Sequence, residues 1–153
     1  MEHVDKIQFK KDLIQKCKLL ITKNSEIARA AMQEHQQLAN DYGQPKDRYD
    51  SFRTQMLRKR DMFAIQYQKA LDELALYEKI DAEKIHTNVS FGCVVITDKQ
   101  KLFVATSLGK ITIENRDFYA ISAAVPIFEK MKGLKVGSLF SFNGQNFTIT
   151  ELF

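Results

Sequence analysis

The residues that break helices are placed unevenly along this chain, and their scarcity in its first part constrains the fold most. The sequence has six glycines and two prolines in 153 residues. Only Gly43 and Pro45 occur before Ser90, whereas the other five glycines and Pro126 follow it. A first segment with a single breaking point favours long helices, and a glycine-containing second segment favours turns and strands. The distribution therefore predicts two architectures in one chain.

Residues 4–40 have the apolar spacing of a coiled-coil helix. Apolar or small side chains recur at intervals of three, four or their sums, at Ile7, Ile14, Cys17, Ile21, Ala28, Ala31 and Leu38. Polar side chains interrupt this seam at Lys10, Asn24 and His35. Residues 51–82 repeat the pattern, at Phe52, Met56, Phe63, Tyr67, Ala70, Leu74 and Tyr77, with an interruption at Lys59. Because the connection is short, the two segments are expected to form an antiparallel hairpin.

The connection between the two predicted helices carries aspartates. Gly43 can end the first helix, Pro45 cannot continue it, and Asp47 or Asp50 can cap the second. Together with Asp41, these carboxylates crowd the tip of the hairpin. Two nearby carboxylates suit a hard cation such as Mg²⁺. Turns and helix N-termini also favour aspartate for backbone reasons alone, so both interpretations stay open.

A basic stretch follows the tip and consists of Arg53, Arg58, Lys59 and Arg60. These side chains could contact the phosphates of a nucleic acid, or they could form the solvated face of a charged helix. The net charge of the whole chain is only +4, which is weaker than a dedicated DNA-binding domain usually shows.

After His86 the apolar period changes to two, which predicts strands. The strand candidates are residues 89–97, 102–107, 111–114, 118–122, 138–142 and 145–152. Asn115-Arg116 and Asn143-Gly144 are the predicted hairpin turns. A short helix is predicted from Ile127 to Lys132, with Pro126 in its first turn and Gly133 at its end. The fold class is therefore α+β: a helical hairpin over residues 1–85, with its tip at about 41–50, followed by a small β-rich domain over residues 86–153.

The sequence has no phosphate-binding loop, nucleophile elbow, dinucleotide fingerprint or metal-ligand cluster, so no enzymatic activity of its own and no small-molecule substrate are expected. Cys17 and Cys93 lie within apolar patterns and are expected to be buried, reduced thiols. No signal-peptide core and no run of membrane-spanning length occur, which favours a cytoplasmic protein with no membrane partner.

Three segments resemble the bacterial Gre transcript-cleavage factors. The most specific is Val125–Ser138, which matches the family at Pro126, Ile127, Gly133, Lys135, Val136 and Gly137. Val89–Gly92 resembles the entry into the family's first C-terminal strand. At the tip, Gly43–Asp47 occupies the place of the family's Gly-Asp-Leu-x-Glu, and Lys46–Ser51 matches a divergent Gre-like version, Gly-Asp-Lys-Tyr-Glu-Thr.

This resemblance implies an FKBP-like C-terminal domain that binds RNA polymerase and a coiled-coil tip that enters the secondary channel. There the family's tip carboxylates help to hold the second magnesium ion, which activates water to cleave backtracked RNA. The implied cofactor is thus Mg²⁺ shared with the polymerase active site, with none intrinsic to the chain. Carried over by position, the first acidic residue of the tip falls on Gln44, the second on Asp47 and a further one on Asp50.

The resemblance also assigns two contact regions. Ser122, Pro126 and Ile127 fall in or beside the segment implicated in polymerase docking. The basic stretch would line the channel or contact the RNA 3′ end. Because Gln44 cannot supply an anionic ligand, stimulation of cleavage and cleavage-free modulation of elongation both stay open. A coiled-coil adaptor or chaperone-like protein-binding module is the alternative from another class. A peptidyl-prolyl isomerase is a third, suggested by the FKBP-like resemblance alone.

Overall fold

The computed structural model describes residues 3–153, which divide into two compact units. One unit is the helical segment Lys18–Ala75, and the other joins the chain up to Cys17 with Leu76–Phe153. The elements are α1 (His3–Tyr42), α2 (Phe52–Tyr77), β1 (Val94–Thr97), β2 (Lys101–Ala105), β3 (Gly109–Ile113), β4 (Arg116–Ser122), α3 (Pro126–Met131), β5 (Leu139–Phe142) and β6 (Gln145–Leu152). The predicted α+β class, with a long helical hairpin before a small β-rich domain, is confirmed.

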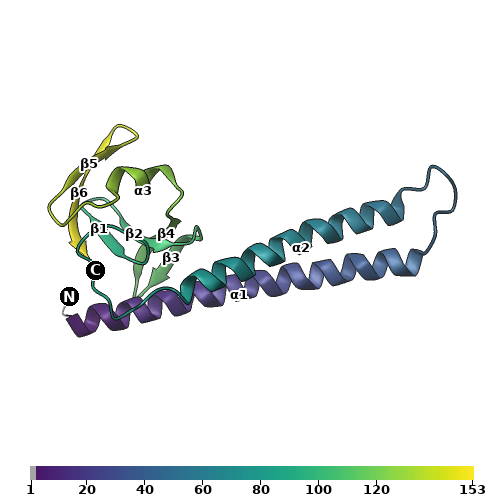
Figure 1. Ribbon diagram of the computed structural model, residues 1–153, viewed down its shortest axis with the longest axis horizontal. Helices are drawn as coiled ribbons and strands as arrows, with labels where there is room; N and C mark the ends of the chain where they lie inside the picture. The colour runs from purple at the N-terminus through teal and green to yellow at the C-terminus, as the bar shows by residue number, and fades with distance from the viewer. Residues whose placement is uncertain (1–2) are drawn as a thin grey trace. The chain divides into compact units, whose positions relative to one another are not determined.

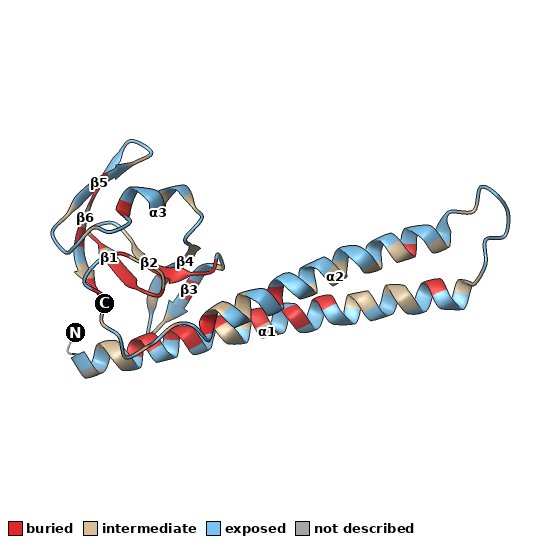
Figure 2. Cartoon of the chain, in the orientation of Figure 1, coloured by how far each residue is buried: buried red, intermediate tan, exposed pale blue. Residues whose placement is uncertain are grey.

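Within the helical unit, α1 and α2 run antiparallel and bury a narrow row of mostly small side chains between them (Figure 2). The buried positions in this unit are Ile21, Ser25, Ala28, Ala39, Met56 and Ala70. Two ring pairs join the helices nearer the tip: His35 and Phe63 have centroids 5.3 Å apart, and Tyr42 and Phe52 have centroids 4.5 Å apart. The antiparallel hairpin predicted from the spacing is confirmed.

The predicted seam of α1 is wrong toward the tip. Leu38 is 40% exposed, whereas its neighbour Ala39 is completely buried. Ser25 is buried in place of the expected Asn24, which is exposed. A seven-residue repeat rotates slowly around a straight helix that has 3.6 residues per turn. Far from the start of α1, the buried position is therefore displaced by one residue from the position that the repeat predicts. Small residues in the corrected seam let the helices approach closely.

The second helix is shorter than predicted, because α2 ends at Tyr77 rather than near residue 82. Tyr77 is buried, and its hydroxyl lies 2.7 Å from the Thr106 hydroxyl oxygen. Two tight turns follow at once, in which the N–H groups of Lys79 and Ile80 donate to carbonyls three residues earlier. The helix therefore ends in tight turns at a buried tyrosine, five residues before the predicted end.

The six strands form one sheet in the order β3-β4-β2-β1-β6-β5 (Figure 1). All neighbouring strands are antiparallel except β2 and β4, which are parallel with Leu102 opposite Tyr119. The predicted turn at Asn143-Gly144 is confirmed, and both residues have positive φ, as a type I′ hairpin requires. The other hairpin turn is wrong by one residue: Glu114 and Asn115 have positive φ, and Ile113 pairs with Arg116.

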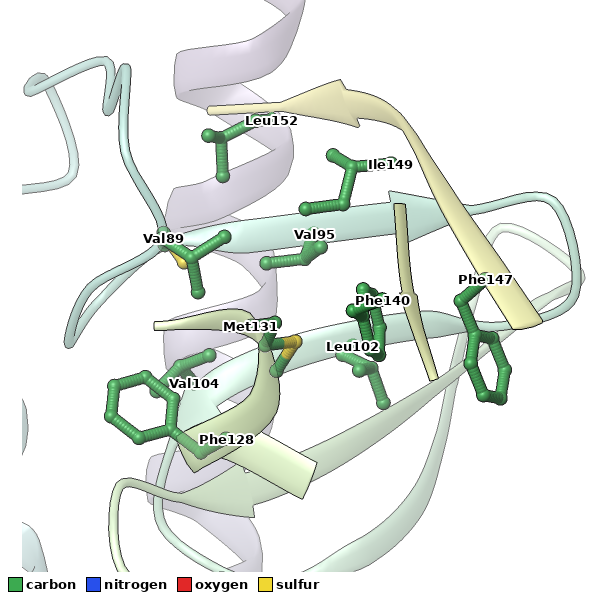
Figure 3. Close-up of a cluster of buried hydrophobic side chains, with 11 residues drawn as sticks. Val89, Val95, Leu102, Val104, Phe128, Met131, Phe140, Phe147, Ile149 and Leu152 are labelled. Carbon is green, nitrogen blue, oxygen red and sulfur yellow. The ribbon is translucent and has the colours of Figure 1, made fainter. Parts of the chain in front are cut away.

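Each face of the sheet is covered within its own unit. On one face, the ring of Phe9 from the start of α1 lies 5.0 Å from that of Phe118 and 6.3 Å from that of Phe153. On the other face, Phe128 and Met131 of α3 pack on a cluster of strand residues (Figure 3). The first turns of α1 therefore belong to the core of the sheet-containing unit.

The segment before β1 is a turn rather than the start of a strand. Val89 was expected to begin a strand, but the ladder starts at Val94. Gly92 has a φ of +88°, and the N–H of Cys93 donates to the carbonyl of Ser90. Val89 instead exchanges backbone hydrogen bonds with Gly133 and Leu134, which fixes the segment after α3.

No helix among residues 3–153 combines the length and the apolar character that crossing a membrane would need.

Candidate functional site: the hairpin tip

The tip of the hairpin is the loop of residues 43–51, between the end of α1 and the start of α2. Gly43 ends α1 with a φ of +77°, and its N–H donates to the carbonyl of Ala39, four residues earlier. Pro45 follows and prevents a further helical turn. Almost all of the loop is exposed (Figure 2). Any function of the tip therefore depends on side chains held by local contacts.

Asp50 is the residue that organises this loop. Its Oδ2 accepts hydrogen bonds from the Tyr42 hydroxyl at 2.6 Å and from the Lys46 N–H at 2.7 Å. Its Oδ1 accepts a hydrogen bond from the N–H of Phe52, the first residue of α2, at 3.2 Å. One carboxylate thus joins the last turn of α1, the middle of the loop and the start of α2, and it satisfies an N–H that the helix itself cannot pair.

These hydrogen bonds change the acidity of both side chains. The Lys46 N–H, with the Tyr42 hydroxyl next in effect, lowers the pKa of Asp50 below its usual value because both stabilise the charged carboxylate. The hydrogen bond to Asp50 raises the pKa of Tyr42. Asp50 is therefore ionised at neutral pH, and both of its oxygens are engaged within the loop.

Asp47 is placed differently. Its Oδ1 accepts the N–H of Tyr49 at 2.7 Å, an Asx turn, while the structure gives its Oδ2 no hydrogen bond from any described residue. The side chain is exposed. Asp47 and Asp50 share no helix face, although they are three residues apart, because α2 begins only at Phe52 and both residues lie in the loop before it. Of these two candidates, Asp47 is the one with a carboxylate oxygen that has no hydrogen-bond partner among the described residues.

The remaining polar groups of the tip add little to a metal site. Gln44 is exposed and uncharged, and Asp41 accepts a hydrogen bond from Gln37 within α1. Among residues 3–153, no three His, Cys, Asp or Glu side chains are grouped so that they could hold a metal ion. The donor set of the tip thus fits the addition of one carboxylate oxygen to a magnesium ion whose other ligands come from elsewhere.

The basic stretch divides into partnered and unpartnered side chains. Arg60 donates from Nη1 to Oε1 of Gln36 at 2.5 Å and pairs with Asp61 at 2.6 Å, so it joins the two helices. Arg53, Arg58 and Lys59 have no hydrogen bond or ion pair with any residue that the structure describes, and Arg58 and Lys59 are exposed. Three of the four predicted contact residues are thus free to meet a phosphate, and Arg60 serves the hairpin.

The predicted docking residues lie together around the start of α3. Ser122 ends β4, where its Oγ accepts the N–H of Ala124 and its own N–H donates to Oγ of Ser107. Pro126 is exposed at the first position of α3, and Ile127 is partly buried against the core cluster. This arrangement offers an exposed, rigid corner, and its role in docking stays a prediction.

Lys10 and His86 are buried titratable side chains of the sheet-containing unit. The side chain of Lys10 is fully buried and donates to the carbonyl of Lys84 at 3.0 Å. Burial lowers the pKa of Lys10 to about 8. Burial, with Lys10 and Lys84 next in effect, lowers the pKa of His86 to about 4, and His86 Nδ1 lies 2.8 Å from Oγ of Ser90. Lys10, taken from the sequence as an interruption of the seam, is thus held by a carbonyl of the segment after α2.

Cys17 and Cys93 are both buried free thiols, as predicted. Burial raises the pKa of each thiol to about 11, so both stay protonated at neutral pH.

Two residues of the tip were not singled out from the sequence. Tyr42 supplies a hydroxyl to Asp50, and Tyr49 is 77% exposed with the Arg48 guanidinium 4.7 Å from its ring centroid. The sequence signal for Tyr49 was an aromatic residue within a polar, charged turn, where it has few apolar neighbours to pack against. Nothing in the spacing indicates that the Tyr42 hydroxyl binds Asp50, eight residues later in the chain.

The comparisons with known proteins give matches among solved structures alone. No family model matches the chain, and no curated protein sequence matches it. One similar solved structure is of the transcription factor Gfh1, with 16% identity, a TM-score of 0.36, and coverage of 88% of this chain and 92% of that one. Another is of the GreA factor homolog 1 (Gfh1) protein of Thermus thermophilus, with 14% identity, a TM-score of 0.34, and coverage of 89% and 94%.

Proposed function

We propose that this chain is a Gre-like transcription factor that binds RNA polymerase and places its hairpin tip in the secondary channel, where it modulates elongation. The observation that carries the proposal is the free carboxylate oxygen of Asp47, held at the end of a helical hairpin by a loop that Asp50 organises. The sequence match to the Gre docking segment around Pro126, on the same chain, supports it. The cytoplasm is the compartment that this function requires.

In this proposal the two aspartates have separate roles. Asp47 is the residue that would donate an oxygen to a magnesium ion held by the polymerase, and such an ion supplies the activation of water that RNA cleavage needs. Asp50 is a positioning residue, because its hydrogen bonds to Tyr42 and to the Lys46 N–H set the loop from which Asp47 projects. With Gln44 uncharged, the chain offers one anionic ligand where the Gre pattern has two.

The binding part of the proposal is tested by capture of the cognate RNA polymerase on the full chain. Retention of the core polymerase subunits is expected, and Pro126→Asp should weaken it because a charge is added to the exposed corner at the start of α3. Capture of other proteins without polymerase subunits would reject the proposal and favour an adaptor.

The catalytic part is tested on a backtracked elongation complex. The wild type is expected to shorten the RNA in a magnesium-dependent manner, and Asp47→Asn should abolish this effect while polymerase capture persists. Asp41→Asn is the matched control, since Asp41 is also an exposed carboxylate with one oxygen engaged in a hydrogen bond, but it lies within α1 rather than in the loop. Equal cleavage by wild type and Asp47→Asn would exclude Asp47 as a ligand. Absence of cleavage by the wild type, with binding intact, would leave modulation of elongation as the function.

A further inference from the structure

Tyr49 is a large aromatic side chain that the loop holds out to solvent. It is 77% exposed, the highest fraction among the exposed large hydrophobic residues that the structure describes. Its N–H is fixed by Asp47, and the Asp50 N–H donates to the Asp47 carbonyl at 3.2 Å, so the backbone on both sides of the ring is restrained. A restrained ring presents its surface to a partner at low entropic cost.

One neighbour of this ring is a cation. The guanidinium of Arg48 lies 4.7 Å from the Tyr49 ring centroid, and its Nη2 donates to the Tyr49 hydroxyl at 2.6 Å. Since the side chain is still 77% exposed, most of its surface stays open beside this contact. An open aromatic face beside a guanidinium is the combination on which unpaired bases stack.

The charge around Tyr49 favours the same class of ligand. From Lys46 to Arg60 the chain has six cationic and two acidic side chains, an excess of four that equals the net charge of all 153 residues. Arg53, Arg58 and Lys59 have no partner among the described residues. At about 100° per residue these three side chains point in different directions around α2, so a single strand beside the loop meets Arg53, the nearest in sequence to Tyr49, rather than all three.

The surroundings of Tyr49 do not resemble a docking groove for an apolar peptide. Its neighbours in the loop, from Gln44 to Arg48, are exposed, and apart from Pro45 they are polar or charged. Apolar partners need a desolvated pocket around an aromatic anchor, whereas a base needs one open face and nearby cations.

We propose that Tyr49 and Arg48 form a stacking platform for an unpaired base of single-stranded RNA, with Arg53 contacting a phosphate of the same strand. The inference deepens the proposed function, because the displaced 3′ end of a transcript is the strand that a tip in the channel would meet. Because the platform consists only of residues of this chain, RNA binding to it can be tested in the absence of polymerase.

The absence of tryptophan from the sequence makes a direct test available. In Tyr49→Trp the indole is the sole tryptophan, and its fluorescence reports stacking on a base. Titration with a short single-stranded RNA is expected to quench it to saturation, with an affinity that falls as salt rises. Inorganic polyphosphate, which has charge but no bases, should not quench it. Single-stranded DNA of the same sequence is the second arm, and equal binding would extend the ligand to either nucleic acid.

Ile65→Trp is the matched control, because Ile65 is 71% exposed on α2 but lies beyond the basic stretch. Equal quenching at positions 49 and 65, or no quenching at 49, would overturn the platform. In the otherwise native chain, Tyr49→Ala should weaken binding of a labelled RNA by about five- to a hundredfold. An unchanged affinity would also overturn it.

The outcomes separate this inference from the proposed function. Polymerase capture without RNA quenching rejects the stacking platform and leaves the Gre-like function in place. RNA quenching without polymerase capture rejects the Gre-like function and retains the platform as a property of the tip.

Discussion

Asp47 and Asp50 are three residues apart in the same loop, yet their chemistry differs because their hydrogen bonds differ. Both oxygens of Asp50 are engaged by Tyr42, Lys46 and Phe52, whereas Asp47 keeps one oxygen without a partner in the described chain. The sequence identifies two carboxylates at a tip and cannot say which is engaged. That distinction depends on the folded loop, in which the backbone N–H groups of Lys46 and Phe52 donate to Asp50.

The role of Asp50 predicts that its loss opens the loop without unfolding the helices. Asp50→Asn weakens three hydrogen bonds that the carboxylate accepts, two of them donated by backbone N–H groups. Trypsin, which cleaves after Lys46 and Arg48, is expected to cut the variant several-fold faster than the wild type, while the helix content by circular dichroism is unchanged. Asp47→Asn is the control and should be cut more slowly than Asp50→Asn. Equal cleavage of the two variants would contradict the organising role of Asp50.

The low pKa of His86 predicts a pH dependence of stability. Burial lowers this pKa from 6.5 to about 4, so between these values the unfolded chain takes up a proton that the folded chain refuses. The free energy of unfolding therefore falls as the pH decreases through this window and is unaffected above it.

The measurement for His86 is urea unfolding at about pH 7 and about pH 4.5. The wild type should lose more stability than His86→Asn, a variant that retains a polar group near Ser90 but does not titrate. Parallel losses in the two proteins would show that other groups cause the acid sensitivity.

At the scale of the elements, the packing of the hairpin depends on small residues rather than on the predicted leucine. Ala39→Leu adds volume at a fully buried position and should destabilise the hairpin by about 1–3 kcal/mol. Leu38→Gln changes a 40% exposed neighbour and should alter stability by no more than about 0.5 kcal/mol. Thermal unfolding followed by circular dichroism compares the two variants. A larger loss of stability in Leu38→Gln than in Ala39→Leu would contradict the observed packing and support the seam predicted from the sequence.

The elements themselves were largely predictable, because their signals are local. A breaker-free run of coiled-coil spacing predicts α1, and Asn143-Gly144 predicts the turn between β5 and β6. The errors occur where tertiary contacts decide. α2 ends at Tyr77, whose hydroxyl lies 2.7 Å from that of Thr106, and the strand before Val94 is replaced by a turn at Gly92. The parallel pairing of β2 and β4 has no local signal at all.

At the scale of the molecule, the two units offer different kinds of surface. The sheet-containing unit is closed by cores on both faces of the sheet and presents the rigid corner at Pro126. The helical unit buries little and presents a polar, charged loop. A rigid domain for docking and an exposed loop for chemistry are what the proposed function needs. The residue types at both places were predictable, but the contact between Tyr42 and Asp50 was not.

The most direct measurement of the proposed function is where the tip lies when the factor is bound to RNA polymerase. A photoreactive residue in place of Gln44, which is exposed and uncharged, probes this position, and one in place of Lys23 on α1 is the control. In a backtracked elongation complex, the probe at position 44 is predicted to crosslink to the polymerase active-site region and to the RNA 3′ end, and the probe at position 23 to neither. Crosslinks from position 44 only to the outer surface of the polymerase, or to no polymerase subunit, would contradict a function in the secondary channel.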